Sequence, residues 1–64
     1  MVGKKRLTTK DDFINCWALQ LDIDIEHKDE DVIIDSGKIE QNEFPHYIVL
    51  NGKTYNINDF LFFY

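Results

Sequence analysis

The stretch that decides the fold is Tyr47-Ile48-Val49-Leu50-Asn51-Gly52-Lys53-Thr54-Tyr55-Asn56-Ile57. Asn51-Gly52 separates two strand-like runs, and Asn-Gly is the preferred two-residue loop of a type I′ hairpin. This register predicts that Ile48 lies opposite Tyr55 and Val49 opposite Thr54. One face of the hairpin is then expected to join the core, and it consists of Ile48, Leu50, Tyr55 and Ile57.

Residues 22–26 alternate strictly between acids and isoleucine. Asp22-Ile23-Asp24-Ile25-Glu26 has the period of two that is typical of a strand with one buried face. The two isoleucines are expected to point inward and the three carboxylates outward. The pattern therefore predicts a strand over 22–26 with an acidic outer surface.

The next segment is predicted to contain short strands separated by a turn. Val32-Ile33-Ile34 is a β-branched strand run, and Asp35-Ser36-Gly37 has turn composition, with a glycine available for positive φ. Residues 38–40 are a candidate return strand. Residues 41–45 are expected to be irregular, because proline cannot donate to a strand ladder.

A helix is predicted over residues 9–20. Thr8 and Thr9 offer capping hydroxyls, and acids follow three residues later in the first turn, where the helix dipole favours them. Apolar residues then recur at helical spacing and form one stripe, which consists of Phe13, Ile14, Trp17, Ala18 and Leu21.

The last residues, Phe60-Leu61-Phe62-Phe63-Tyr64, form a run of five apolar or aromatic side chains. Asn58 could cap a final helical turn, or the run could be a strand with Phe60, Phe62 and Tyr64 on one face. Either geometry leaves some aromatic surface outside a small core.

Together these patterns predict an α+β domain, in which an N-terminal helix packs on a small, mostly antiparallel sheet with a C-terminal Asn-Gly hairpin. Residues 1–7 are predicted to be a flexible basic arm, and residues 8–64 a single domain. A chain of 64 residues has a marginal core and needs its large side chains, Trp17 among them.

The cellular setting follows from cysteine count and hydropathy. Cys16 is the only cysteine, so no disulfide forms within the chain, and a reducing cytoplasm is expected. No apolar run approaches the roughly 20 residues that span a bilayer. The basic start is not followed by the apolar stretch of a signal peptide. We therefore expect a soluble cytoplasmic protein without membrane attachment.

Catalytic and metal-binding patterns are weak in this sequence. Cys16 lies in the middle of the predicted helix, away from the N-terminus that would acidify its thiol. The acids of 22–26 resemble the start of a Ca²⁺ loop, but His27 stands where glycine is needed and Ile33 where glutamate is needed. One cysteine and two separated histidines, His27 and His46, do not fit a zinc site. We therefore predict no enzyme activity, no catalytic residues, no metal and no cofactor.

Charge is divided unevenly along the chain. The formal net charge is −5, but residues 1–10 carry +4 and residues 22–43 carry −7. The acidic majority repels nucleic acid and anionic membranes, so direct binding to either is not expected.

The acidic segment is the first candidate binding site. Carboxylates on one strand face are spaced about 6.7 Å apart, and such a row is similar to a nucleic-acid backbone. The sequence thus predicts an inhibitor or regulator that occupies the basic groove of a DNA- or RNA-binding protein; the alternative is an ordinary solvated face. In size and charge the chain resembles the small acidic proteins with which phages and other mobile elements block host proteins. The predicted partner-binding residues are Asp22, Asp24, Glu26, Asp29, Glu30, Asp31 and Asp35.

The aromatic end supports a second hypothesis from a different class. Exposed clustered aromatic residues mark interfaces, so the chain could be a structural or subunit-type interaction module that forms a homodimer through its C-terminus. The residues predicted for self-association are Phe60, Phe62, Phe63 and Tyr64.

Overall fold

A computed structural model describes residues 4–30 and 32–64 as one helix and five strands. The elements are α1 (Lys10–Ala18), β1 (Asp22–His27), β2 (Ile33–Glu43), β3 (Tyr47–Leu50), β4 (Lys53–Asn56) and β5 (Phe60–Phe63). The strands form one sheet in the order β4-β3-β2-β1-β5, and each pairing is antiparallel. The predicted α+β class is confirmed. No helix among the described residues is long and apolar enough to cross a membrane.

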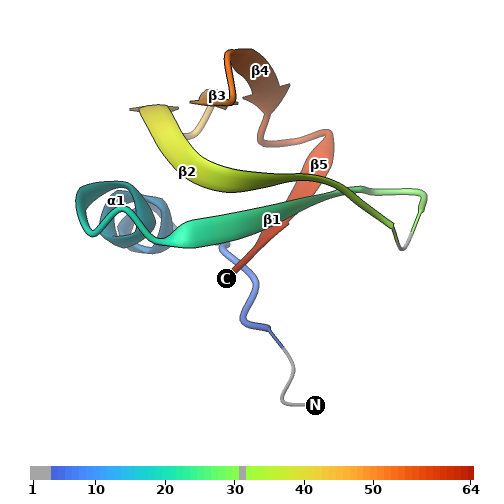
Figure 1. Cartoon of the computed structure of the whole chain (residues 1–64), viewed down its shortest axis with the longest axis horizontal. Helices are drawn as coiled ribbons and strands as arrows, with labels where there is room; N and C mark the ends of the chain where they lie inside the picture. The colour runs from blue at the N-terminus through green and yellow to red at the C-terminus, as the bar shows by residue number, and fades with distance from the viewer. Residues whose placement is uncertain (1–3, 31) are drawn as a thin grey trace.

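The sheet is strongly bent along β2 (Figure 1). The first part of β2 pairs with β1 and the second part pairs with β3, so β2 belongs to both halves of the sheet. Irregular register occurs between Ile25 and Glu26 and between Ile39 and Gln41, and such bulges increase local bending. The bend brings the sheet ends together: the rings of Tyr55 in β4 and Phe60 in β5 lie 5.2 Å apart.

The Asn-Gly hairpin has the predicted register. Ile48 pairs with Tyr55 and Val49 with Thr54. Asn51 and Gly52 have φ angles of 53° and 75°, as a type I′ turn requires. Ile48, Leu50 and Tyr55 are buried and Ile57 is half-buried against the core. The hairpin prediction is therefore confirmed in both its register and its buried face.

The strand predicted over 22–26 is also confirmed as β1. Ile23 and Ile25 are fully buried, whereas the three acids that alternate with them lie on the opposite face. Among residues 4–30 and 32–64, the core that these isoleucines join contains ten buried residues, which are Leu7, Phe13, Cys16, Ile23, Ile25, Ile39, Ile48, Leu50, Tyr55 and Phe62.

The helix begins where its capping residues predict. The Thr9 hydroxyl accepts a hydrogen bond from Asp12 N at 3.2 Å, and the Asp12 carboxylate accepts one from Thr9 N at 3.1 Å. A further hydrogen bond from Thr8 N is the main reason that the pKa of Asp12 lies below its ordinary value. This reciprocal capping satisfies helix N–H groups that have no partner within the helix.

The buried stripe of α1 differs from the prediction. Phe13 and Cys16 are buried, but Trp17, which we expected in the core, is 44% exposed. With about 100° between successive residues, the direction midway between Phe13 and Cys16 lies roughly 70° from Trp17. The helix meets β2 along that direction, and Trp17 is left at the margin of the contact.

The prediction of a turn at residues 35–37 is wrong. β2 runs through Asp35-Ser36-Gly37 without a break, and Ser36 and Gly37 pair with Asp24 and Ile23 of β1. β2 also includes residues 41–43, which we expected to be irregular, and the irregular segment is limited to 44–46. The turn-like composition instead marks a bend, because Gly37 adopts a φ of 151° within the strand.

Replacing Gly37 by alanine is expected to lower the free energy of unfolding by about 1–3 kcal/mol. The new Cβ would lie 3.3 Å from Asn51 Nδ2, which is held by two hydrogen bonds, and the φ angle disfavours any side chain. Urea denaturation measures the loss. Gly52→Ala is the matched control, since its φ is also positive but nothing lies within 4 Å of its Cβ. A Gly37→Ala variant no less stable than Gly52→Ala would contradict a role for the Asn51 contact.

The C-terminal run forms strand β5, so the alternative of a helical turn capped by Asn58 is wrong. Phe62 points into the core, with its ring 5.4 Å from that of Phe13. Strand geometry is favoured here because β1 offers an edge, with Phe62 paired to Ile25. The strand alternative of the sequence analysis is thus the observed one.

The predicted basic arm is partly ordered. Lys5 N donates to Tyr64 O at 3.0 Å, Tyr64 N to Lys5 O at 2.9 Å, and Leu7 N to Phe62 O at 2.8 Å. These hydrogen bonds pair the segment with the free edge of β5, and Leu7 becomes buried there. The flexible arm predicted over 1–7 is therefore corrected for residues 5–7, while residues 1–3 lie outside the described residues.

Candidate protein-binding surface

The two predicted binding segments meet on one face of the sheet. Asp24 of β1 pairs with Phe63 of β5, and Glu26 pairs with Leu61, so these side chains share the face that points away from the core. We call this the outer face of β5, β1 and β2. Its members are Asp22, Asp24, Glu26, Ile33, Ser36, Lys38, Leu61 and Phe63.

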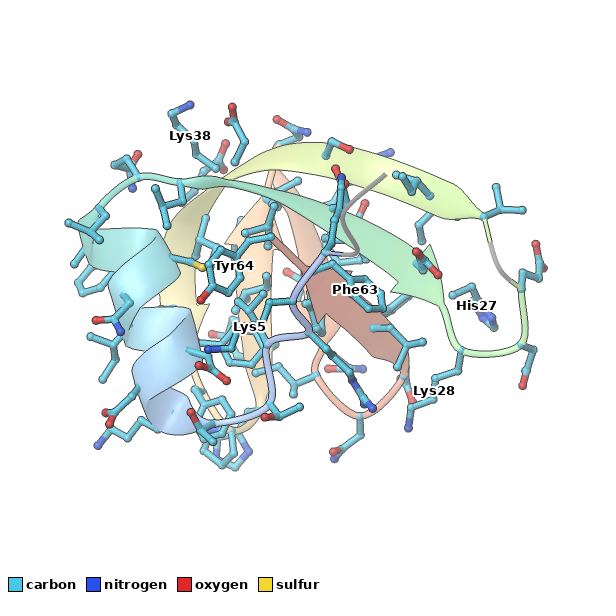
Figure 2. All side chains as sticks on the ribbon, turned by 90° about the horizontal axis from the view of Figure 1, so that it is seen from below. Lys5, His27, Lys28, Lys38, Phe63 and Tyr64 are labelled. Atoms are coloured by element: carbon cyan, nitrogen blue, oxygen red, sulfur yellow. The ribbon has the colours of Figure 1, made fainter. Side chains whose placement is uncertain are left out.

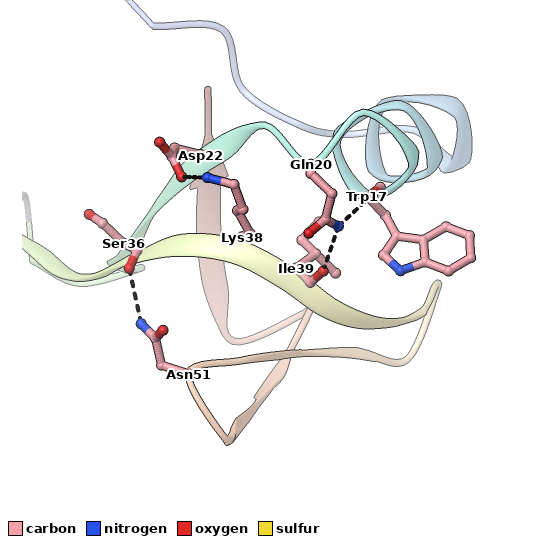
Figure 3. Close-up of polar contacts among 7 residues, drawn as sticks. All are labelled: Trp17, Gln20, Asp22, Ser36, Lys38, Ile39 and Asn51. Atoms are coloured by element: carbon pink, nitrogen blue, oxygen red, sulfur yellow. Dashed lines mark hydrogen bonds and ion pairs between the residues drawn. The ribbon is translucent and has the colours of Figure 1, made fainter.

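Two of the three β1 carboxylates on this face already have cationic partners. The Lys38 ammonium lies 2.7 Å from Asp22 Oδ1 across the strands (Figure 3). Asp24 accepts a hydrogen bond from the Ser36 hydroxyl at 2.7 Å and contacts the Lys4 ammonium, and its side chain is only 14% exposed. Asp22 is largely exposed, so its ion pair opens easily. The carboxylate row is therefore not an array of three free charges.

Asp35 lies away from this row. It pairs with buried Ile25, so it points toward the opposite face of the sheet. Its carboxylate accepts hydrogen bonds from the Tyr55 hydroxyl at 2.6 Å, from Asn51 Nδ2 at 2.8 Å and from Ser36 N at 2.8 Å. The Tyr55 hydroxyl is the main reason that the Asp35 pKa lies below its ordinary value. Asp35 connects the bend of β2 to the Asn-Gly hairpin.

Three of the remaining predicted acids lie in or next to the β1–β2 loop. Asp29 and Glu30 are exposed, and Glu26 is half-buried at the end of β1. Within residues 4–30 and 32–64, neither Asp29, Glu30 nor Glu26 forms an ion pair. Asp31 lies outside the described residues. The least compensated negative charge therefore sits at the loop end of the outer face.

Three consecutive aliphatic residues follow this loop. Val32, Ile33 and Ile34 are 57%, 50% and 46% exposed, and we call them the β1–β2 patch. Their β-branched composition predicts a strand but does not predict that they are exposed. They remain exposed because the bulge between Ile25 and Glu26 leaves Ile34 without a β1 partner and sets Ile33 opposite Glu26.

The four residues predicted for self-association are separated by the strand. Phe62 is 1% exposed and belongs to the core, so it is not available to a partner. Phe60 is half-buried, with its ring packed edge-on against Tyr55 and His27. Phe63 lies on the outer face, and Tyr64 is 40% exposed beside Lys5 (Figure 2). Of the four, only Phe62 is fully buried, and Tyr64 is the most exposed.

The described residues enclose no pocket and contain no group of three or more side chains suited to hold a metal ion. Burial, together with the charge of Asp12, raises the pKa of the Cys16 thiol, so the thiol stays protonated. The outer face and the β1–β2 patch are thus the candidate binding surfaces.

Comparisons with known proteins found no match: no family model, no curated protein and no solved structure is similar to this chain.

Proposed function

We propose that this chain is a non-enzymatic protein-binding regulator that holds a basic protein against the β1–β2 patch and the neighbouring outer face. The observation that supports the proposal is the exposure of three consecutive aliphatic side chains, Val32, Ile33 and Ile34, beside uncompensated acids. Contiguous exposed apolar residues with a polar rim mark interaction sites.

Apolar contact supplies the binding free energy in this proposal. Burying exposed apolar surface contributes about 25 cal/mol per Å², and the contacts around the centre of an interface exclude water from it. Ile33 lies at one end of a row across the sheet, in which Glu26 is the middle residue and Leu61 the other end. The surface around the patch therefore combines apolar and acidic side chains.

Charge selects the class of partner. Asp29 and Glu30 flank the patch, and the segment 22–43 carries a formal charge of −7. A basic surface is attracted to such a region and a second acidic surface is repelled. A partner held in this way has its basic surface covered, so binding would inhibit whatever that surface does. Nucleic-acid binding is one such activity, and mimicry of nucleic acid remains a special case of the proposal.

The test compares the wild-type chain with a variant in which the patch is polar but still β-branched, Val32→Thr, Ile33→Thr and Ile34→Thr. Basic proteins retained from a cell lysate are identified, and the affinity of the purified partner is then measured at low and high salt. We expect the patch variant to bind at least about tenfold more weakly, which corresponds to about 1.4 kcal/mol. Asp29→Asn with Glu30→Gln is expected to reduce the salt dependence.

The control is Lys53→Gln with Asn56→Gln, two exposed positions on β4, outside the outer face. Equal affinity of the patch variant and this control for the same partner would contradict the proposal. Competition by double-stranded DNA and by RNA distinguishes mimicry of nucleic acid from binding at another basic surface of the partner. A partner displaced by either nucleic acid is bound through its nucleic-acid groove, and a partner that is not displaced is bound elsewhere.

A further inference from the structure

The turn residues Asn51 and Gly52 form a chemically reactive pair. Asn51 is the only one of the five asparagines in the chain that precedes a glycine. A backbone nitrogen can attack the side-chain carbonyl of the preceding asparagine, and glycine, which has no side chain, hinders this attack least. Both residues are exposed at the tip of the hairpin. The reaction therefore needs only the chain itself and water.

The reaction of this pair is a deamidation. Gly52 N loses its proton and forms a bond to Asn51 Cγ, while the bond from Cγ to Nδ2 breaks and the nitrogen leaves as ammonia. Water then opens the resulting cyclic imide at one of its two carbonyl groups. The product is aspartate or isoaspartate, and in either form a neutral amide has become a carboxylate.

In the folded chain both reacting groups are held by β2. Asn51 Nδ2 donates to Asp35 Oδ1 at 2.8 Å and to Ser36 O at 3.0 Å (Figure 3). Gly52 N donates to the Glu40 carboxylate at 3.1 Å. The amide that must leave thus has both of its hydrogens bonded, and the attacking nitrogen is held in a hydrogen bond of its own. Attack therefore requires the hairpin tip to move away from β2.

We propose that Asn51 is a deamidation site that folding protects, so that it reacts when the hairpin tip opens from β2. An exposed turn can open locally without unfolding of the whole domain. The product cannot restore the native contact, because a carboxylate at position 51 has no hydrogen to donate and faces the carboxylate of Asp35. Like charges this close repel each other. Deamidation is thus a one-way change that loosens the hairpin from the bend of β2.

The inference does not rest on the proposed function, because neither Asn51 nor Gly52 belongs to the β1–β2 patch or the outer face. The experiment incubates the full chain at mildly alkaline pH, folded or unfolded in guanidinium chloride at matched ionic strength. Mass spectrometry of proteolytic peptides then follows the conversion of Asn51. We expect the reaction to be at least about tenfold slower in the folded chain, because only the opened fraction reacts.

Glu40→Ala distinguishes protection of Gly52 N from the opposite role, in which the carboxylate acts as a base and removes its proton. We expect deamidation of the folded variant to be at least about threefold faster, since the hydrogen bond that holds the turn is lost. In guanidinium chloride its rate should equal that of the wild type. Glu43→Ala is the matched control, because Glu43 is exposed on the same strand but accepts from Gln41 instead of the turn.

Equal rates in the folded and unfolded chains would overturn the proposal, and so would a Glu40→Ala variant that reacts no faster than Glu43→Ala. Asn51→Asp tests the consequence, because it places one product of the reaction in the chain. We expect its urea midpoint to lie below that of Asn51→Gly, which adopts the same positive φ without a charge beside Asp35. Equal midpoints would contradict the loosening of the hairpin.

Discussion

Phe62→Ala is expected to leave the chain largely unfolded, or only marginally stable, at room temperature. Phe62 is 1% exposed, and its ring packs edge-on against Phe13, which in turn lies 5.2 Å from the ring of Phe44. Truncating a buried phenylalanine to alanine costs about 3–5 kcal/mol. A domain of this length has a total stability of roughly 3–10 kcal/mol, so one such loss removes a large part of it.

Urea denaturation followed by circular dichroism measures this effect. Tyr64→Ala is the control, because Tyr64 is 40% exposed and its backbone hydrogen bonds to Lys5 do not require the ring. We expect the control to lose less than about 1 kcal/mol. If Phe62→Ala stays folded and loses only self-association, Phe62 is an interface residue after all, as the composition of the C-terminal run first indicated.

The features predicted correctly from the sequence depend on neighbouring residues. Asn51-Gly52 determines a two-residue turn, and the turn determines which residues of the hairpin face each other. The alternation around Ile23 and Ile25 and the capping by Thr9 are equally local signals. The geometry of each pattern is set by interactions within a few residues, so contacts with distant segments did not change it.

The features that were missed depend on contacts between distant segments. The segment Asp35-Ser36-Gly37 has the composition of a turn. Because it pairs with β1, it forms a bend within a long strand instead. Leu7 stands in a basic segment without periodicity, and only the free edge of β5 explains why it is buried. Trp17 fits the helical stripe as well as Phe13 does, and the angle at which α1 meets β2 leaves it exposed. None of these contacts can be inferred from the neighbouring residues in the sequence.

The candidate surface was predicted only in part. The acids at the end of β1 and in the following loop were recognised from their number, but pairing with Lys4 and Lys38 could not be seen in a linear sequence. The β1–β2 patch was read as an ordinary strand run, since β-branched residues are usually buried. The bulge that exposes it depends on the register between two strands, and register is not encoded by composition.

The second large effect is expected at Asp35, whose carboxylate accepts the Tyr55 hydroxyl at 2.6 Å and Asn51 Nδ2 at 2.8 Å. Asp35→Ala removes the acceptor of a tyrosine that is only 7% exposed. Leaving a buried donor without a partner costs about 1–3 kcal/mol, and the lost Asn51 bond adds about 1 kcal/mol. We therefore expect a decrease of about 2–4 kcal/mol in the free energy of unfolding.

The same pair predicts how stability depends on pH. The Tyr55 hydroxyl above all, with Asn51 and Ser36 N, holds the Asp35 pKa below the ordinary 3.8, so its contribution is present above that pH and is lost as pH falls through the lower folded value. Burial first, and then Asp35, raises the pKa of Tyr55 to about 12. The neutral phenol is thus favoured in the folded state, and its contribution is complete below about pH 10 and lost as pH rises toward 12.

Urea denaturation across this pH range, with the ultraviolet absorbance of tyrosinate as a second readout, measures both ends of the profile. Asp35→Ala should weaken the acid and alkaline losses together, whereas Tyr55→Phe should remove the alkaline loss and reduce the acid one. Tyr55→Phe should also be the milder change in stability, because Asp35 still accepts from Asn51 and Ser36 when the hydroxyl is gone. If the two variants lose equal stability and keep the wild-type pH profile, the hydroxyl and the carboxylate do not act as a pair. The two variants differ in stability because of what each leaves without a partner. In Tyr55→Phe, the Asp35 carboxylate still has other donors, whereas in Asp35→Ala the buried Tyr55 hydroxyl loses its acceptor.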